Sequence, residues 1–267
     1  MKSLRIDAEK SPISNIIIAV LLAIGLSSFP TVWILSQFFE VSKTLSLYLS
    51  AITKIAFCAV FVYLIYSYDF NGLFRWKISK FYLVIPCFLV VINNFPFIAV
   101  ITGEALITAS TAKIIGYVLY SFSVALFEEL AFRGLVFPLV YLKTKDKKKG
   151  LFIALVISSL IFGAVHIVNF FAGANIGSVL LQMCYSFLIG GMCSIALCIT
   201  GGLIIPILLH FIFNFGGLFI ETLGSGAIWN IPTIMITAIL GVIVAIYMII
   251  IALKLKEDNL KPLLKIQ

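Results

Sequence analysis

Six ionisable residues lie inside long apolar stretches of this 267-residue sequence, where a charged side chain is costly unless it is paired or hydrated. They are Lys54, Glu128, Glu129, Arg133, His166 and His210. The sequence has only two histidines, and both belong to this set. Because such groups are expensive to keep at these positions, they are the first candidates for chemistry.

Two adjacent carboxylates begin the sequence Glu-Glu-Leu-Ala-Phe-Arg at 128–133. Residues four apart share one face of a helix, so Arg133 can neutralise Glu129 within the same helix. Glu128 is turned away from that pair and is expected to be free. A free carboxylate in an apolar environment suits a general base that activates water. The alternative is one buried ionic cluster that only fixes helix packing.

The two histidines stand in different apolar stretches, in the patterns Phe-x-x-x-His at 162–166 and His-x-x-x-Asn at 210–214. In the second pattern, the spacing puts the His210 imidazole and the Asn214 carboxamide on one helix face. Both groups can donate hydrogen bonds to a single oxygen, as in an oxyanion hole. For either histidine alone, a hydrogen bond between helices is the commoner role, and only the conjunction with the glutamates favours catalysis.

The elements that position these residues are expected to be membrane-spanning helices. Hydrophobic residues make up 62% of the sequence and charged residues 11%, and the mean hydropathy is +1.18. Apolar runs of at least ~18 residues, each long enough to cross a bilayer, recur along the chain. The sequence predicts an all-α, polytopic integral membrane protein that forms a single membrane domain over 1–267, with the motifs in 114–221. The predicted spans are 14–36, 45–68, 80–101, 114–142, 151–172, 178–199, 202–221 and 229–254.

The positive charges predict the orientation of these about eight helices. With these spans, fifteen of the 19 Lys and Arg residues fall on one side, in the first segment, the loop at 69–79 with Lys80 at its edge, the loop at 143–150, and the tail from Lys254 onward. The positive-inside rule then places both termini in the cytoplasm of a multi-pass cell-membrane protein. The net charge of +8 therefore reflects topology, and nucleic acid is not an expected partner.

The depths of the candidate residues can be compared by counting from the helix ends. Glu128 lies 15 residues before Lys143 and His166 lies 15 residues after Leu151, so both are expected roughly 22 Å above the same membrane surface. Counted from Gly202, Asn214 reaches that plane but His210 falls short of it, at roughly 12 Å. The depths therefore predict that Glu128 and His166 are level with each other.

The three motifs together, in this order and on successive helices, resemble those of the CAAX protease and bacteriocin-processing family, also called the ABI family. This family includes the Ras-converting CAAX prenyl endopeptidases. The resemblance covers about 128–214 directly, and no motif position departs from it.

The resemblance implies an eight-helix membrane fold that encloses a catalytic cavity within the membrane. By motif, Glu128 and His166 activate the hydrolytic water, His210 and Asn214 stabilise the oxyanion, and Glu129 and Arg133 support the site. The scheme needs no metal or other cofactor, and the sequence contains no HExxH pattern. Family members in Gram-positive bacteria are associated with peptide pheromones, bacteriocins and self-immunity. The expected partners are therefore the lipid bilayer and a small membrane-associated peptide, and the oligomeric state is left open.

Three other interpretations remain open at this point. A zinc peptidase could use His166, His210 and a glutamate as ligands. A noncatalytic immunity or scaffold protein could retain the same motifs. A transporter is less favoured because no repeated halves with paired broken helices are evident, although Asn93, Asn94 and Pro96 could mark one break. The five cysteines lie in apolar segments without ligand spacing and are expected to be packing residues.

The orientation can be tested by cysteine-accessibility labelling. Cysteines introduced at Lys147 and Lys256 are both expected to react from the cytoplasmic side, because both positions belong to the basic side of the charge distribution. An external label at either position would overturn the orientation and the comparison of depths.

Overall fold

The computed structural model of the chain describes residues 10–75, 80–226 and 231–265. The first half contains two short 3₁₀ turns, η1 (Asn71–Phe74) and η2 (Phe81–Val84), and the strand β1 (Ala105–Ile107). Its helices are α1 (Pro12–Ser27), α2 (Thr31–Ser36), α3 (Lys43–Ser67), α4 (Ile85–Asn93), α5 (Phe97–Ile101) and α6 (Thr111–Ala131).

The second half begins with a π-helical turn, η3 (Phe132–Val136), and contains two 3₁₀ turns, η4 (Val165–Ile167) and η5 (Glu257–Asn259), and the strand β2 (Gly224–Gly226). Its helices are α7 (Phe137–Thr144), α8 (Gly150–Ala164), α9 (Val168–Phe171), α10 (Ile176–Thr200), α11 (Ile204–Gly217), α12 (Phe219–Leu223), α13 (Ile231–Lys254) and α14 (Lys261–Leu264). The two strands pair antiparallel and are the only sheet in the described parts of the chain.

The prediction of an all-α, polytopic membrane protein is confirmed. Over the described residues, six helical segments are long and apolar enough to cross a membrane. Two shorter apolar helices, Phe81–Asn93 and Ile204–Gly217, correspond to the predicted third and seventh spans. Residues 229 and 230, at the start of the predicted last span, lie outside the described residues.

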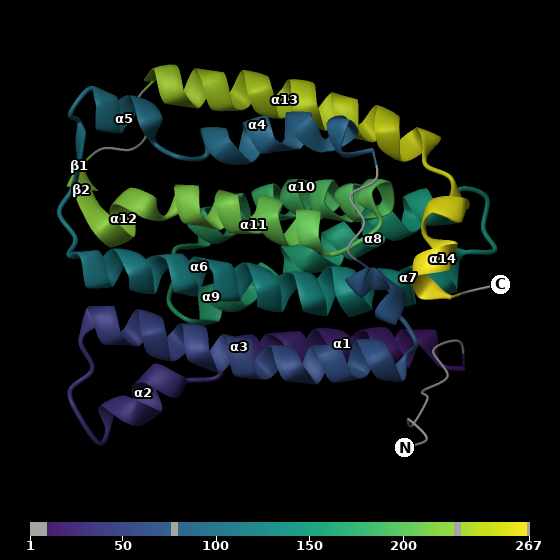
Figure 1. Cartoon of the computed structure of the whole chain (residues 1–267), viewed down its shortest axis with the longest axis horizontal. Helices are drawn as coiled ribbons and strands as arrows, with labels where there is room; N and C mark the ends of the chain where they lie inside the picture. The colour runs from purple at the N-terminus through teal and green to yellow at the C-terminus, as the bar shows by residue number, and fades with distance from the viewer. Residues whose placement is uncertain (1–9, 76–79, 227–230, 266–267) are drawn as a thin grey trace.

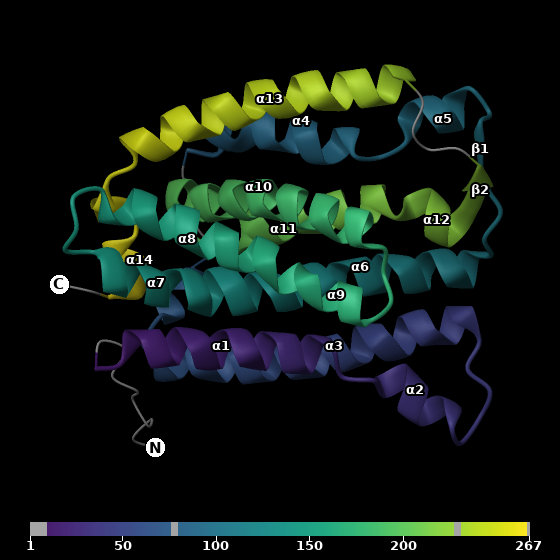
Figure 2. The same ribbon diagram turned by 180° about the vertical axis from the view of Figure 1, so that it is seen from behind.

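The helices are stacked in layers, with α13 and α4 along one side, α10 and α11 in the middle, and α3 and α1 along the other side (Figure 1). From behind, α8 crosses in front of α10, and α1 lies in front of α3 (Figure 2). Burial agrees with these positions, because only 11% of the most apolar window in the α1–α2 and α13 segments is buried, against 67% in α10. The outer helices therefore present apolar side chains to lipid, and α10 is mostly covered by other helices.

The third span is broken between α4 and α5, at Asn94, Phe95 and Pro96. Asn94 Nδ2 donates to the Phe213 carbonyl oxygen of α11 at 2.7 Å, and Asn93 Nδ2 donates to Thr237 Oγ1 of α13 at 2.8 Å. The break that Asn93, Asn94 and Pro96 could mark is present, and both asparagines also bond to neighbouring helices. The two asparagines tie the broken span to a helix on either side.

A wide π turn lies between α6 and α7, immediately after the two glutamates. Pro138, near the start of α7, has no N–H to donate to the preceding turn, and its ring crowds the carbonyl four residues before it. Widening the helix over 132–136 relieves that crowding without ending the span. The π turn contains Arg133, so it sets the direction in which this side chain leaves the helix.

Contacts at both ends fix the position of α11. At its beginning, the Leu203 N–H donates to the Leu73 carbonyl of η1 at 3.1 Å. At its end, the Tyr117 hydroxyl of α6 donates to the Phe215 carbonyl at 2.7 Å. Gly216 lies so close to Phe95 that an added Cβ would be 2.8 Å from its backbone nitrogen. The register of α11 relative to α6 is thereby set by contacts outside the chemical motifs.

Candidate active site

A buried chain of three side chains joins α6, the π turn and α11. Arg133 Nη1 lies 2.9 Å from Glu129 Oε1, and His210 Nδ1 lies 2.7 Å from the same oxygen. Relative exposures are 1% for Arg133, 0% for Glu129 and 3% for His210. A carboxylate paired with arginine can only accept hydrogen bonds, so Nδ1 of His210 must carry the proton that points at Glu129.

The Arg133 guanidinium fits closely among apolar groups. Its Cζ lies 4.3 Å from the centroid of the Phe162 ring, over the ring face, which favours a cation. A Cβ added at Gly190 of α10 would come within 3.0 Å of the Phe162 ring and 3.1 Å of Arg133 Nη2. Nη1, Nη2 and Glu129 Oε2 have no well-aligned hydrogen-bond partner among the described residues, although the ion pair itself is short. Close packing and charge attraction therefore hold the pair together.

Glu128 lies on the other side of the His210 ring. Its Oε2 is 3.5 Å from His210 Nε2, and its side chain is 18% exposed, whereas the Glu129 side chain is fully buried. The expected separation of Glu128 from the Glu129–Arg133 pair is present, but the expectation that Glu128 is free is wrong, because His210 lies between the two carboxylates. At 3.5 Å the contact is electrostatic rather than a short hydrogen bond.

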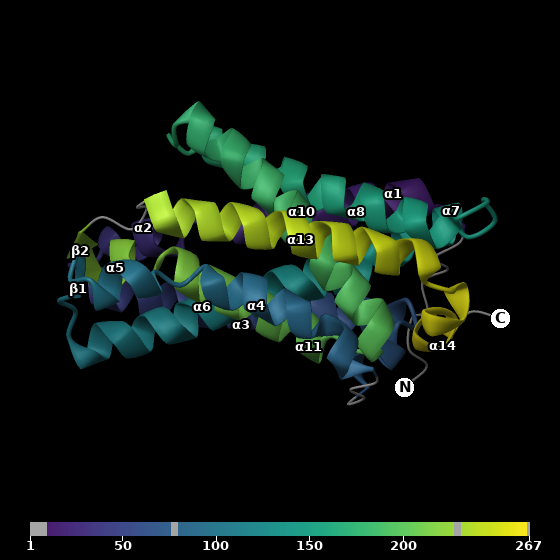
Figure 3. The same ribbon diagram turned by 90° about the horizontal axis from the view of Figure 1, so that it is seen from above.

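His166 lies in η4, where α8 changes to a 3₁₀ turn. Its Nδ1 is 2.8 Å from the Phe162 carbonyl oxygen, so Nδ1 carries the proton of the neutral ring. Nε2 then keeps its lone pair and faces Ser186 Oγ of α10 at 3.5 Å. Figure 3 shows α8 and α10 running side by side, with their ends near α9 diverging from α6 and α11. His166 is thus a half-buried residue whose Nε2 faces α10.

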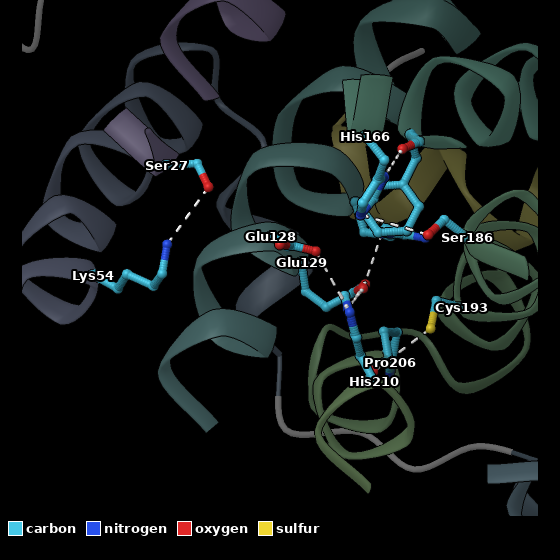
Figure 4. A network of polar contacts seen from close by, with 11 residues as sticks. Ser27, Lys54, Glu128, Glu129, His166, Ser186, Cys193, Pro206 and His210 are labelled. Atoms are coloured by element: carbon cyan, nitrogen blue, oxygen red, sulfur yellow. Dashed lines mark hydrogen bonds and ion pairs between the residues drawn. The ribbon is translucent and has the colours of Figure 1, made fainter. Parts of the chain in front are cut away.

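The Phe162 ring links the candidate residues that come from different helices. Its centroid is 5.2 Å from that of His166 and 5.7 Å from that of His210, and both ring pairs meet edge to face. Figure 4 shows Glu128 and Glu129 beside His210, with His166 and Ser186 on the neighbouring helices. The phenylalanine of the Phe-x-x-x-His motif therefore spaces the two histidines and also covers Arg133.

Asn214 lies one turn after His210 on α11 and is half-buried. Its backbone carbonyl accepts a hydrogen bond from the Tyr117 hydroxyl at 3.2 Å. This contact fixes the backbone that carries the carboxamide. The spacing of the predicted His-x-x-x-Asn pair on one helix is therefore present, and Tyr117 holds it against α6.

The comparison of depths from the sequence was wrong for His210, which contacts both glutamates although counting from Gly202 placed it below them. The reason lies before α11, where the chain passes over η1 and a Cβ at Gly202 would be 2.5 Å from the Arg75 carbonyl oxygen. The short helix begins at Ile204, directly after Leu203, whose N–H donates to η1. Helix length therefore could not give its depth.

The zinc-ligand hypothesis finds no assembled ligand set among the residues that the structure describes. No three His, Cys, Asp or Glu side chains gather there at distances suited to one metal ion. His166 Nδ1 is engaged by a carbonyl, and its Nε2 faces Ser186. His210 has a carboxylate at each ring nitrogen. The ring nitrogens of both histidines are therefore in contact with other groups of the protein.

Ser186 was missed in the sequence because a single serine in a span is unremarkable. It is buried, with a relative exposure of 4%, and faces His166 Nε2. Its role could have been suggested only by knowing that it faces the Phe-x-x-x-His motif from α10. That knowledge requires the packing of the two helices.

The part of the chain that carries this arrangement matches a known protein family. Residues 110–216 match the family model described as type II CAAX prenyl endopeptidase Rce1-like. This segment is an Rce1-like domain. It runs from the beginning of α6 nearly to the end of α11 and includes all six predicted site residues. No curated protein and no solved structure gives a significant match to the chain.

The Rce1-like domain supports an intramembrane endopeptidase at the level of the family, acting on a peptide substrate in a lipid bilayer. The long apolar helices agree with a multi-pass membrane protein.

The buried pair in the Rce1-like domain leads to a stability prediction. In Arg133→Ala, Glu129 loses its cation at a position with 0% exposure, and breaking such a pair costs about 3–5 kcal/mol. We expect poor expression or a clearly lower melting temperature in detergent. Glu128→Gln is the comparison variant, since it removes the carboxylate next to Glu129 in the sequence and leaves the Glu129–Arg133 pair intact. Equal melting temperatures of Arg133→Ala and the unaltered protein would show that the pair does not stabilise the fold.

Proposed function

We propose that the chain hydrolyses a peptide bond within the membrane by means of a water molecule activated by Glu128 and His166. The observation that carries this proposal is the different environment of the two adjacent glutamates. The Glu129 carboxylate is buried and contacts both Arg133 and His210 Nδ1, whereas Glu128 is partly exposed beside His210 Nε2. Of the two glutamates, only Glu128 is accessible enough to accept a proton from water.

The hydrogen bond at His166 supports its part in the same step. Because Nδ1 donates to the Phe162 carbonyl, the Nε2 lone pair is available to accept a hydrogen bond from water. In the proposed reaction the water oxygen attacks the peptide carbonyl carbon while its proton passes to Glu128. The C–N bond then breaks, and Glu128 returns the proton to the leaving amine, which gives a carboxylic acid and an amine.

His210 and Asn214 are proposed to stabilise the negative oxygen of the tetrahedral intermediate. In the proposed step His210 donates from Nδ1 to Glu129 and from Nε2 toward the reacting oxygen, which requires a proton on each ring nitrogen. The Glu129 carboxylate, paired with Arg133, faces the Nδ1 side of that ring.

The substrate is proposed to be a small membrane-associated peptide, such as a pheromone or bacteriocin precursor, rather than a soluble protein. The lipid-facing surface supports this choice, because large apolar side chains on α1, α8, α10 and α13 are exposed. A peptide held in the bilayer reaches a site at membrane depth without crossing into water. We also propose that 1–267 is a single membrane domain with both termini in the cytoplasm.

Loss of the base tests the proposal directly. We expect Glu128→Gln to fold normally and to lose activity by about 10²-fold or more, the scale of general-base catalysis. The assay incubates the detergent-solubilised protein with a library of N-acylated apolar peptides and identifies the products by mass spectrometry. Glu40→Gln, the same change at an exposed loop position, is the matched control.

Two results would reject the catalytic role of Glu128. A Glu128→Gln variant as unstable as Arg133→Ala would place the carboxylate in the structural cluster. A stable and fully active variant would show that another group is the base. If the unaltered protein cleaves no peptide of the library while it binds some of them, the noncatalytic alternative is favoured.

Chelation separates the proposed mechanism from a zinc peptidase. We expect peptide cleavage to survive exhaustive treatment with a chelator, because a carboxylate and an imidazole preorganised in a water-poor site can activate water without a Lewis acid. The measurement is cleavage rate before and after chelation. Loss of activity that returns on addition of zinc would establish the metal-dependent alternative.

A further inference from the structure

Lys54 is the one embedded ionisable residue that the proposed mechanism does not use. It lies in the middle of α3, and its Nζ is 3.5 Å from Ser27 Oγ of α1 and 5.3 Å from the centroid of the Phe127 ring of α6. An ammonium group has three N–H donors, and a single hydroxyl at 3.5 Å satisfies them poorly. The side chain therefore has capacity to bind an acceptor.

A cavity adjoins this ammonium where α1 ends and α2 begins. It has a volume of about 200 Å³ and is bounded by α1, α2, α3 and α6. Its polar lining consists of Lys54 and five hydroxyl-bearing residues: Ser27, Thr31, Ser50, Thr53 and Tyr120. No carboxylate is among the described residues that line it, so the cavity has one positive charge and several hydroxyl donors.

One of these hydroxyl groups is buried without a partner. Thr31 Oγ1 has no hydrogen-bond partner among the described residues, whereas Thr53 Oγ1 donates to the Leu49 carbonyl at 2.9 Å. A buried hydroxyl without a partner is costly, and so is an ammonium group with only one long contact. A ligand oxygen that accepts from the Lys54 ammonium would remove the cost at that group.

The cavity adjoins the turn of α6 that carries the proposed base. Phe127, whose ring lies beneath the Lys54 ammonium, immediately precedes Glu128. Lys54 and Tyr120 are both within electrostatic range of Glu128. In Figure 4, Glu128 lies between Lys54 on one side and His166 and His210 on the other. The cavity, which Tyr120 of α6 lines, and the proposed base therefore lie about two turns apart on α6.

We propose that the cavity is a subsite for a carboxylate of the peptide substrate, bound by the Lys54 ammonium and by the hydroxyl group of Ser27. This inference rests on the proposed function. A monoanion matches the single charge of Lys54, and the ammonium also shields the incoming carboxylate from Glu128. The carboxylate is either the end of the peptide chain or an acidic side chain near the scissile bond.

The experiment compares apolar peptides that end in a free carboxylate with the same peptides ending in a carboxamide. We expect the unaltered protein to have the lower KM for the acid. Lys54→Met is expected to raise KM for the acid by about tenfold or more, the value of a hydrogen bond to a charged group, and to leave KM for the amide unchanged. Lys54→Arg should retain the preference. Lys43→Met removes an exposed charge from the first turn of α3 and is the matched control.

A binding measurement separates this inference from the proposed function. Fluorescein-labelled acid and amide peptides are titrated against Glu128→Gln and against Glu128→Gln combined with Lys54→Met or with Ser27→Ala, and anisotropy is recorded. We expect tighter binding of the acid only where Lys54 is present, with an intermediate effect of Ser27→Ala. An amide-ended peptide with a glutamate near its end would recover the tighter binding if an acidic side chain is the source. Absence of cleavage by the unaltered protein would reject the proposed function without changing this result.

Three outcomes would overturn the subsite. Equal losses on acid and amide peptides, with a displaced pH profile of cleavage, would make Lys54 a positioning residue for Glu128. Equal binding of acid and amide by every variant would leave the cavity without a role in substrate binding. Binding that depends on Lys54 only in nanodiscs containing phosphatidylglycerol, for acid and amide alike, would assign the cavity to a lipid phosphate.

Discussion

The contact between Arg133 and Glu129 is the constraint on which the other features of the site depend. Both side chains are almost completely buried in a helix at membrane depth, where either charge alone would be very unfavourable. Their pairing places a fixed negative charge against His210 Nδ1 and so determines which ring nitrogen carries the inner proton. Phe162 of α8 and Gly190 of α10 pack closely against the guanidinium, so both helices contact the same ion pair.

Irregular helical turns and a helix break occur at or beside the residues of the candidate site. The π turn contains Arg133, a 3₁₀ turn contains His166, and the break in the third span adjoins α11. In a membrane such irregularities are tolerated only when the released backbone groups find partners within the protein. Asn94 and Tyr117 donate to carbonyl groups of α11, so side chains stabilise a short helix that could not span the bilayer by itself.

The features that could be predicted from the sequence are those that depend on neighbouring residues within one helix. The Glu129–Arg133 pair follows from a spacing of four, and the apolar runs give the long spans within a few residues of their ends. The sequence could not predict the register of α11, because this depends on contacts of Gly202 and Leu203 with a distant turn. The contact of Ser186 with His166 and the cavity at Lys54 could not be predicted either, because each is formed by residues of several packed helices.

In the proposed mechanism, two adjacent glutamates serve two requirements that one carboxylate cannot meet. A group that holds His210 and Arg133 must be dry and fully engaged, whereas a group that accepts a proton from water must be partly accessible. Successive residues of a helix point about 100° apart, so one turn can bury Glu129 and leave Glu128 at an edge. The exposures of 0% and 18% show this division. His210 lies between the carboxylates, so the ring that Glu129 orients faces Glu128, the proposed base.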